Sequence, residues 1–148
     1  MKNRIEKIKS LSGSWMESYF YPPASESDIY EYEKNKNIVI PKSYKELLLL
    51  TNGARIFGAD ICLYGVSGDI KYYVNYDVTD ELVPKEFPKE LLILGYYNDK
   101  HICYDRHDDI YVFYRDEKYE RIKEECAIFN DFGEVLDFAI DVVDEEDR

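Results

Sequence analysis

Three apolar runs that follow one another at short intervals constrain the fold of this chain more than any other feature. They are LLILGYY (residues 91–97), HICYD (residues 101–105) and IYVFYR (residues 110–115). Their residues suit the surface of a sheet, and the NDK and RHDD sequences between them are typical of turns. The sequence therefore predicts an antiparallel β-meander over residues 91–115.

The N-terminal residues predict a short helix followed by a connection. Ile5, Ile8 and Leu11 recur at steps of three, which predicts an amphipathic helix over residues 2–11. Residues 13–25 include a Pro-Pro pair that disfavours regular structure, so we expect a connecting loop there.

A second helix is predicted in the sequence SDIYEYEKN. Either Ser25 or Ser27 suits the position before its first turn, where a hydroxyl oxygen accepts hydrogen bonds from free backbone amides. We expect Ile29, Tyr32 and Glu33 on its inner side.

LLLLTNG (residues 47–53) fits either a strand entering a hairpin turn or the last turns of a helix. Pro41 favours a helix start, leucine is a strong helix former, and ARIFGAD beyond the glycine shows no alternation that would supply a partner strand. Four residues would share one helix face, namely Tyr44, Leu47, Leu48 and Thr51. We therefore predict a helix over residues 42–51, ended by Asn52, with Gly53 in the left-handed conformation after it.

The remaining segments add strands and a closing helix. DICLYG (residues 60–65) is typical of a strand, residues 69–88 indicate no single element, and ERIKEECAIF (residues 120–129) fits an edge strand or a loop. Asn130 is a good helix cap. The apolar residues after it follow a helical stripe, namely Phe132, Val135, Leu136, Ala139, Ile140 and Val143. Residues 144–148 are expected to form a frayed acidic tail.

Helices first, then a strand meander, then a closing helix predict one α+β domain over residues 1–148, with its core at about residues 25–143. The chain shows no apolar run long enough to cross a membrane and no signal-peptide pattern. Cys62, Cys103 and Cys126 have no metal-type spacing, so we expect free buried thiols and a cytoplasmic protein.

The charge balance separates classes of partner. The chain has 31 acidic and 19 basic residues, a net charge of −12. Such a surface repels nucleic acid and anionic lipid and favours encounter with a basic protein. The alternative is that the acidity only confers solubility. Fifteen tyrosines, several of them paired or beside acids, fit a protein interface, with ordinary sheet packing as the alternative.

HICYDRHDD is the one cluster of catalytic residue types, and the chain has no P-loop, GxGxxG, HExxH or GxSxG motif. His101 and Cys103 would share one face of a strand, which is compatible with a metal site or a Cys-His nucleophile pair. We favour an inward Cys103 with partly exposed histidines, His107 lying in the turn. Carboxylate pairs elsewhere fit a solvated acidic face. We predict no catalytic residue, metal, cofactor or enzyme activity.

The order of motifs resembles one protein superfamily. DIYEYEKN is followed by IPKSYKELLLLTNG, FGADICLYG, FPKELLILG, ICYDRHDDIYVFY and IFNDFGEVLDFAI. This order is similar to that of the SUKH superfamily, although YYNDK stands where members often have a glycine-rich turn and Tyr114 where tryptophan is common. The matching residues are expected to determine the fold: Pro41, Tyr44, Leu48, Asn52, Gly53, Gly58, Ile61, Tyr64, Gly65, Pro88, Leu91, Ile93, Gly95, Cys103, Asp105, Val112, Tyr114, Phe129 and Phe132.

The resemblance implies a binding module. Bacterial SUKH proteins are similar to immunity proteins of polymorphic toxin systems, which bind and neutralise a cognate toxin domain, often a nuclease. The other hypotheses are a scaffold or regulatory module like the fungal cell-wall regulators, and a small hydrolase that uses His101 and Cys103. We expect a basic protein partner to contact tyrosines and nearby acids, namely Tyr72, Tyr73, Tyr76, Asp77, Asp80, Glu81, Tyr96, Tyr97 and Asp99.

Overall fold

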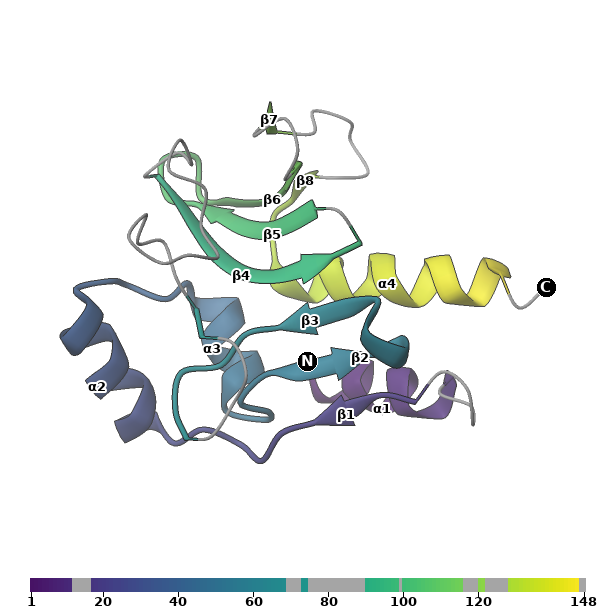
Figure 1. The fold of residues 1–148 in the computed structure, drawn as a ribbon, viewed down its shortest axis with the longest axis horizontal. Coiled ribbons are helices and arrows are strands. Elements are labelled where there is room, and N and C mark those ends of the chain that lie inside the picture. Colours follow the sequence, from purple (N-terminus) through teal and green to yellow (C-terminus); the bar gives the residue numbers. More distant parts are fainter. Residues whose placement is uncertain are drawn as a thin grey trace.

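The computed structural model describes residues 1–11, 17–68, 73–74, 90–98, 100–115, 120–121 and 128–146. Within these residues the chain forms an α+β fold (Figure 1). The helices are α1 (Lys2–Leu11), α2 (Glu26–Lys36), α3 (Lys42–Leu48), the 3-10 helix η1 (Phe57–Ala59) and α4 (Phe132–Glu146). The strands are β1 (Tyr19–Phe20), β2 (Ala54–Ile56), β3 (Ile61–Leu63), β4 (Leu91–Tyr97), β5 (Lys100–Asp105), β6 (Ile110–Arg115), β7 (Glu120–Arg121) and β8 (Ile128–Phe129).

The strands form one antiparallel sheet in the order β1-β2-β3-β4-β5-β6-β7, and β8 also pairs with β6. The predicted meander is confirmed, since β5 lies between β4 and β6 and Cys103 faces Ile93 on one side and Val112 on the other. The register of β4 against β5 shifts between Ile93 and Gly95. A side chain at Gly95 would collide with the carbonyl of Cys62, so the glycine allows β3 and β4 to approach.

Successive residues of the meander alternate between two buried clusters. Leu92, Ile102 and Phe113 belong to the main core, whereas Leu91 and Cys103 belong to a second cluster on the other face of the sheet. Burial of both faces explains why LLILGYY is apolar throughout. The helices cover the main core, with α1 behind β1 and β2 and α4 beside β3 and β4 (Figure 1).

The N-terminal helix α1 is part of this core, although it lies before residue 25, where the core was predicted to begin. Ile5 and Ile8 are buried in the main cluster, as their spacing predicts. Arg4 donates to the Asp137 carboxylate of α4 through Nε (2.9 Å) and Nη2 (3.2 Å). The two ends of the chain therefore hold each other in place.

Ser25, one of the two serines predicted as a possible cap, caps the N-terminus of α2. The amide of Asp28 donates to the Ser25 hydroxyl (3.0 Å), and the amide of Ser25 donates to the Asp28 carboxylate (3.1 Å). Reciprocal bonds of this kind satisfy amides that the first helical turn leaves free. Ile29 and Tyr32 are buried on the inner side of α2, as predicted.

Glu33, also predicted on the inner side, connects α2 to α3. Its carboxylate accepts from the amide of Ile40 (2.8 Å) and pairs with Lys45 Nζ (3.1 Å). These contacts hold the short extended link between the two helices.

The helix predicted to reach Thr51 ends earlier, at Leu48. The carbonyl of Leu47 accepts from the amides of both Leu50 (2.9 Å) and Thr51 (2.8 Å), and this closes a turn. Leu49 and Leu50 lie in that turn and are exposed. The prediction relied on the helix propensity of leucine and made the helix three residues too long. The chain reverses direction here to enter the sheet, and propensity does not show this.

The strand β2 forms within ARIFGAD, where the sequence indicated no strand, although it is not a partner for residues 47–50. β2 pairs with both β1 and β3. Ala54 and Ile56 are buried and Arg55 is exposed between them, an alternation only three residues long. The backbone enters β2 through Gly53, whose φ of +98° confirms the predicted left-handed conformation. β1 likewise lies inside the stretch predicted as a loop, at an edge of the sheet where a following Pro-Pro pair is tolerated.

The C-terminal stripe is confirmed, because all six of its apolar residues are buried in α4. The first turn of α4 is capped by Asp131, whose carboxylate accepts from the amide of Gly133 (2.6 Å). The cap had been predicted at Asn130, one residue earlier. α4 continues to Glu146, into the residues expected to fray.

β7 and β8 agree with the edge-strand alternative for parts of residues 120–129. None of the helices in the described ranges has the length and apolar character that a membrane crossing requires.

Candidate protein-binding site

Three of the nine residues predicted to bind a partner lie in the described part of the chain, namely Tyr73, Tyr96 and Tyr97. The other six lie outside the described residues, namely Tyr72, Tyr76, Asp77, Asp80, Glu81 and Asp99. The three described tyrosines have three different surroundings.

Tyr97, at the end of β4, packs between the sheet and α4. Its ring centroid lies 5.6 Å from that of Phe113 and 5.7 Å from that of Phe138 in α4. Lys100 Nζ lies 5.4 Å from the centre of the same ring. These contacts favour the sheet-packing alternative for Tyr97.

Tyr96 points to the opposite side of the sheet, because successive side chains of a strand alternate. Its ring meets that of His101 on β5 edge to face, with centroids 5.6 Å apart. His101 is buried, so the half-buried ring of Tyr96 also packs against the protein's own interior.

Tyr73 is the described tyrosine that combines firm support with exposure. Its ring stacks on that of Tyr32 in α2, with centroids 6.1 Å apart and planes 12° apart. Its hydroxyl donates to the carbonyl of Gly68, and the hydroxyl of the buried Tyr32 donates to the carbonyl of Val74. Even so, 40% of the surface of Tyr73 is exposed.

Asn52 bonds the backbone of residues 66–67, just before Gly68, which accepts from the hydroxyl of Tyr73. Its amide Nδ2 donates to the carbonyl of Ser67 (2.7 Å), and its Oδ1 accepts from the amide of Val66 (2.8 Å). The amide of Val74 then donates to the carbonyl of Gly65 (2.9 Å). Asn52 was predicted only to end a helix, and its buried amide instead fixes the segment that follows β3.

Asp28 puts a negative charge beside the tyrosine pair. The amide of Ser25 donates to its carboxylate (3.1 Å) and lowers its pKa, and the side chains of Ser25 and Ser67 lower it further. Ser67 immediately precedes Gly68, which accepts from the hydroxyl of Tyr73. Asp28 also lies four residues before Tyr32, so both side chains project from the same side of α2.

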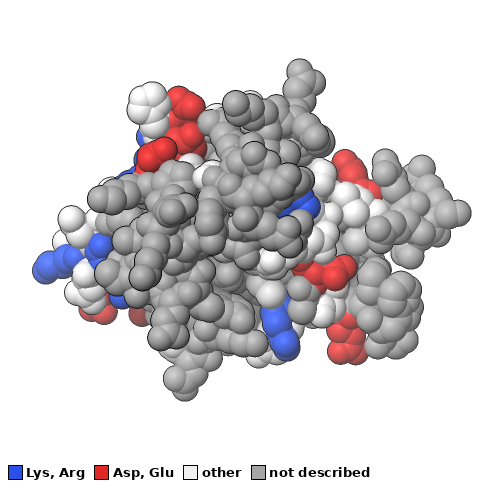
Figure 2. All heavy atoms as spheres, turned by 45° about the horizontal axis from the view of Figure 1, so that its top comes forward, with Lys and Arg blue, Asp and Glu red and all other residues white. Residues whose placement is uncertain are grey.

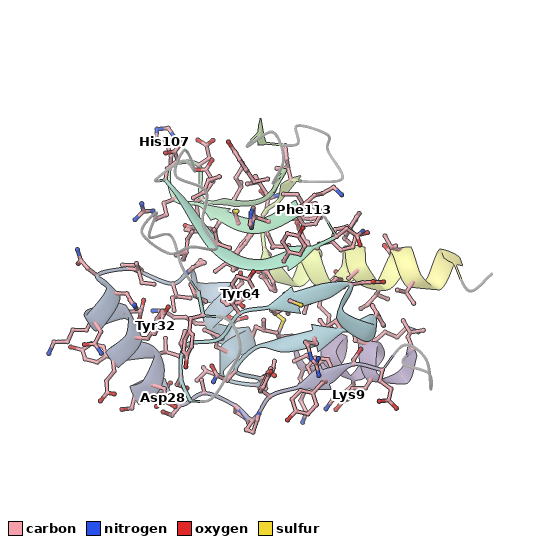
Figure 3. All side chains as sticks on the ribbon, viewed as in Figure 1. Lys9, Asp28, Tyr32, Tyr64, His107 and Phe113 are labelled. Carbon is pink, nitrogen blue, oxygen red and sulfur yellow. The ribbon has the colours of Figure 1, made fainter. Side chains whose placement is uncertain are left out.

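Glu31 extends this charge along α2. It is exposed and lies three residues after Asp28, a spacing that puts both carboxylates on one side of the helix. Figure 3 shows Asp28 near the N-terminal end of α2 and Tyr32 directed from α2 toward the strands. The pattern SESD predicts a cap, but no local pattern indicates that Tyr32 of this helix stacks on Tyr73.

The residues that carry the family resemblance hold the layers together. The Tyr44 hydroxyl of α3 donates to the carbonyls of Tyr64 and Leu94, the latter at 3.0 Å. The Tyr44 ring meets Phe132 of α4 edge to face, with centroids 4.7 Å apart. Ser43 contacts the Tyr111 hydroxyl (2.5 Å), so α3, α4 and the sheet meet around these side chains.

A comparison with protein families matches residues 23–137 to the SMI1 / KNR4 family (SUKH-1). The chain belongs to the SUKH-1 family. The match covers most of the chain and confirms the resemblance to the SUKH superfamily. A comparison with curated proteins finds no match.

In this SUKH-1 domain, His101 and Cys103 lie on one face of β5, as predicted, but both are buried. Exposure of His101 was therefore predicted wrongly, whereas His107 is exposed as expected. Burial raises the pKa of the Cys103 thiol, and the charge of Asp105 raises it further. A neutral, enclosed thiol is a poor nucleophile.

The turn between β5 and β6 uses its own acids. Asp105 accepts from the amide of His107 (2.9 Å), and the hydrogen bond that the His107 ring donates to the Asp108 carboxylate (2.9 Å) is the main cause of the raised pKa of His107. The hydroxyl of Tyr104 donates to Asp109 (2.6 Å), and burial with this contact raises the pKa of Tyr104 to about 12. These carboxylates stabilise the turn itself.

Among the described residues on the face shown in Figure 2, acidic side chains form separate groups with basic ones among them. Among the described residues, no group of three or more His, Cys, Asp or Glu side chains is arranged to hold a metal ion. The arrangement around Tyr73 is suited to contact with another protein.

Proposed function

We propose that this SUKH-1 domain is an immunity protein, which binds a basic toxin domain of the nuclease type and neutralises it in the cytoplasm of the producing cell. The family match over residues 23–137 carries the proposal, because bacterial SUKH proteins are similar to immunity proteins of this kind. The net charge of −12 supports it independently.

The physical basis is competition for a phosphate-binding surface. A nuclease binds the nucleic-acid backbone with Lys and Arg side chains, so its active face is basic. An acidic protein meets that face quickly and leaves the polyanionic substrate no room. The immunity protein needs no catalytic group for this.

A second candidate is a non-catalytic scaffold or regulatory module that binds a host protein. The matched family favours it, because SMI1 / KNR4 is the group named after the fungal cell-wall regulator. This candidate does not require a basic partner, and the acidity would then serve only solubility.

A pull-down separates the two candidates. The full chain serves as bait in lysate that contains the secreted and antibacterial effectors of the source strain, and bound proteins are eluted with rising salt and identified by mass spectrometry. The immunity proposal expects a basic toxin domain that high salt releases. A housekeeping protein without any toxin would favour the regulatory module.

A nuclease assay then tests neutralisation. The recovered domain is incubated with plasmid DNA or total RNA while the immunity protein is titrated in. We expect cleavage to stop near equimolar protein, with bovine serum albumin as the control. Undiminished cleavage at a large excess would contradict the proposal even if the two proteins bind.

A further inference from the structure

We propose that Tyr73, with Asp28 and Glu31 of α2, is the surface through which the domain holds a basic protein partner, an assignment that rests on the proposed function. Tyr73 supplies an aromatic face, and the two carboxylates supply charge on the adjoining side of α2. The partner group that fits is an Arg or Lys side chain, which stacks on the ring and pairs with a carboxylate.

The support of Tyr73 is the first argument. One face of its ring rests on Tyr32, and its hydroxyl is held by the carbonyl of Gly68. The backbone beneath it is held in turn by the bonds of Asn52 and by the bridge between Gly65 and Tyr73. A side chain that is already ordered loses little entropy on binding, which is why rigid aromatic side chains are good anchors in interfaces.

Exposure is the second argument. Tyr73 keeps 40% of its surface exposed although it has these contacts, whereas Tyr32 beneath it is buried. Soluble domains usually use the apolar area of a tyrosine for their own packing, as Tyr97 does with Phe113 and Phe138. Tyr73 has a face left for a partner.

Charge is the third argument, and it selects the kind of partner. The Asp28 carboxylate accepts from the amide of Ser25 (3.1 Å) and lies one helical turn before Tyr32, and Glu31 is exposed three residues after Asp28. An aromatic ring beside fixed carboxylates attracts cationic side chains and repels phosphate. With the net charge of −12, this makes a basic protein the occupant and excludes nucleic acid.

The chain offers matched controls for both kinds of side chain. Tyr30 lies on α2 and is 66% exposed, but it stands about 200° around the helix from Asp28. Glu46 is an exposed carboxylate on α3, so Glu46→Lys changes the net charge as much as Glu31→Lys does. A loss that comes only from the general field of the protein would affect both charge variants equally.

The experiment measures binding of the basic domain recovered in the pull-down, by titration calorimetry with the full chain. Tyr73→Ala and Glu31→Lys are each expected to weaken binding about tenfold or more, as central interface residues do. Tyr30→Ala and Glu46→Lys are expected to stay within about threefold of the parent protein. Tyr73→Phe, which keeps the ring, is expected to bind nearly as well as the parent. Circular dichroism checks that each variant is folded, and Glu31→Lys decides the matter if Tyr73→Ala is not.

The outcomes separate the surface from the function. Parent-like binding by Glu31→Lys and by folded Tyr73→Ala would overturn this surface and leave the immunity function standing. Equal losses for Glu31→Lys and Glu46→Lys would also overturn it, because binding would then follow net charge alone. If the parent protein recovers no basic domain, the proposed function fails and this surface fails with it.

Discussion

The core around Tyr97 and the surface around Tyr73 use the same side chain in different ways. Tyr97 contacts Phe113 on the sheet and Phe138 on α4, so its ring joins two layers of the domain. Tyr73 stacks on Tyr32 and keeps 40% of its surface exposed. The number of layers around an aromatic ring decides whether it stabilises the fold or remains available to a partner.

The largest expected effect tests the core side of this comparison. Phe113 is 3% exposed and its ring contacts Tyr97, Phe129 and Phe138. Phe113→Ala should lower the free energy of unfolding by about 3–5 kcal/mol through lost burial and a cavity. Urea denaturation followed by fluorescence measures this, with Phe113→Leu as a milder control. A loss below about 1 kcal/mol would show that this cluster does not hold the layers together.

The next effect tests the support of the Tyr73 surface. Asn52→Ala removes a buried amide that bonds Val66 and Ser67, so about 1–3 kcal/mol of stability should be lost. Amide hydrogen exchange should speed up at Val66 and Val74 while the amides of β5 stay protected. Asn35→Ala, an exposed change on α2, is the control. Uniform loss of protection would mean that the two regions unfold as one unit.

The third test compares the loss of stability and the loss of partner affinity in Tyr97→Ala and Tyr73→Ala. Tyr97→Ala removes two ring contacts and should cost about 1–3 kcal/mol, whereas Tyr73→Ala removes one and should cost about 0.5–1.5 kcal/mol. Partner affinity should show the opposite order, with Tyr73→Ala the weaker binder. Thermal unfolding and calorimetry of the same two variants give both rankings. The same order in both measurements would remove the distinction between core and surface.

The smallest effects concern pH. The folded-state pKa of Asp28 lies below its ordinary value of 3.8, so its stabilising contribution is complete above pH 3.8 and is lost as the pH falls through the lower folded value. His107 has the opposite sign, because its pKa is raised above 6.5 and its contribution disappears as the pH rises through the raised value.

We expect Asp28→Asn to flatten only the acid limb of a plot of melting temperature against pH, and His107→Gln to flatten only the limb above pH 6.5. Differential scanning fluorimetry over the full pH range measures both limbs. A changed acid limb in His107→Gln, or an unchanged one in Asp28→Asn, would contradict these assignments.

Local patterns were enough to predict much of the fold. The meander, the cap at Ser25 and the stripe of α4 each repeat over several residues or join neighbours in the chain, so short-range geometry determines them. β1 and β2 were missed because two or three residues carry no period. The early end of α3 was missed because its last turn depends on the path into the sheet.

The candidate site was predicted less completely. Tyr73 was included among the partner-binding residues, but so was Tyr97, because a pair of tyrosines looks the same in sequence whether it is covered or exposed. Asp28 and Glu31 were not included, since only the folded chain brings α2 next to a segment some forty residues later, where Tyr73 stacks on Tyr32.

The sequence by itself determined the fold class, the family and the acidity that favours a basic partner. Those properties follow from composition and from the order of short motifs. Only the tertiary structure decided which tyrosine is enclosed, that His101 and Cys103 are buried together, and that Asn52 supports the segment before Tyr73. The physical reason is that burial depends on what packs over a side chain, and residues far away in the chain supply that cover.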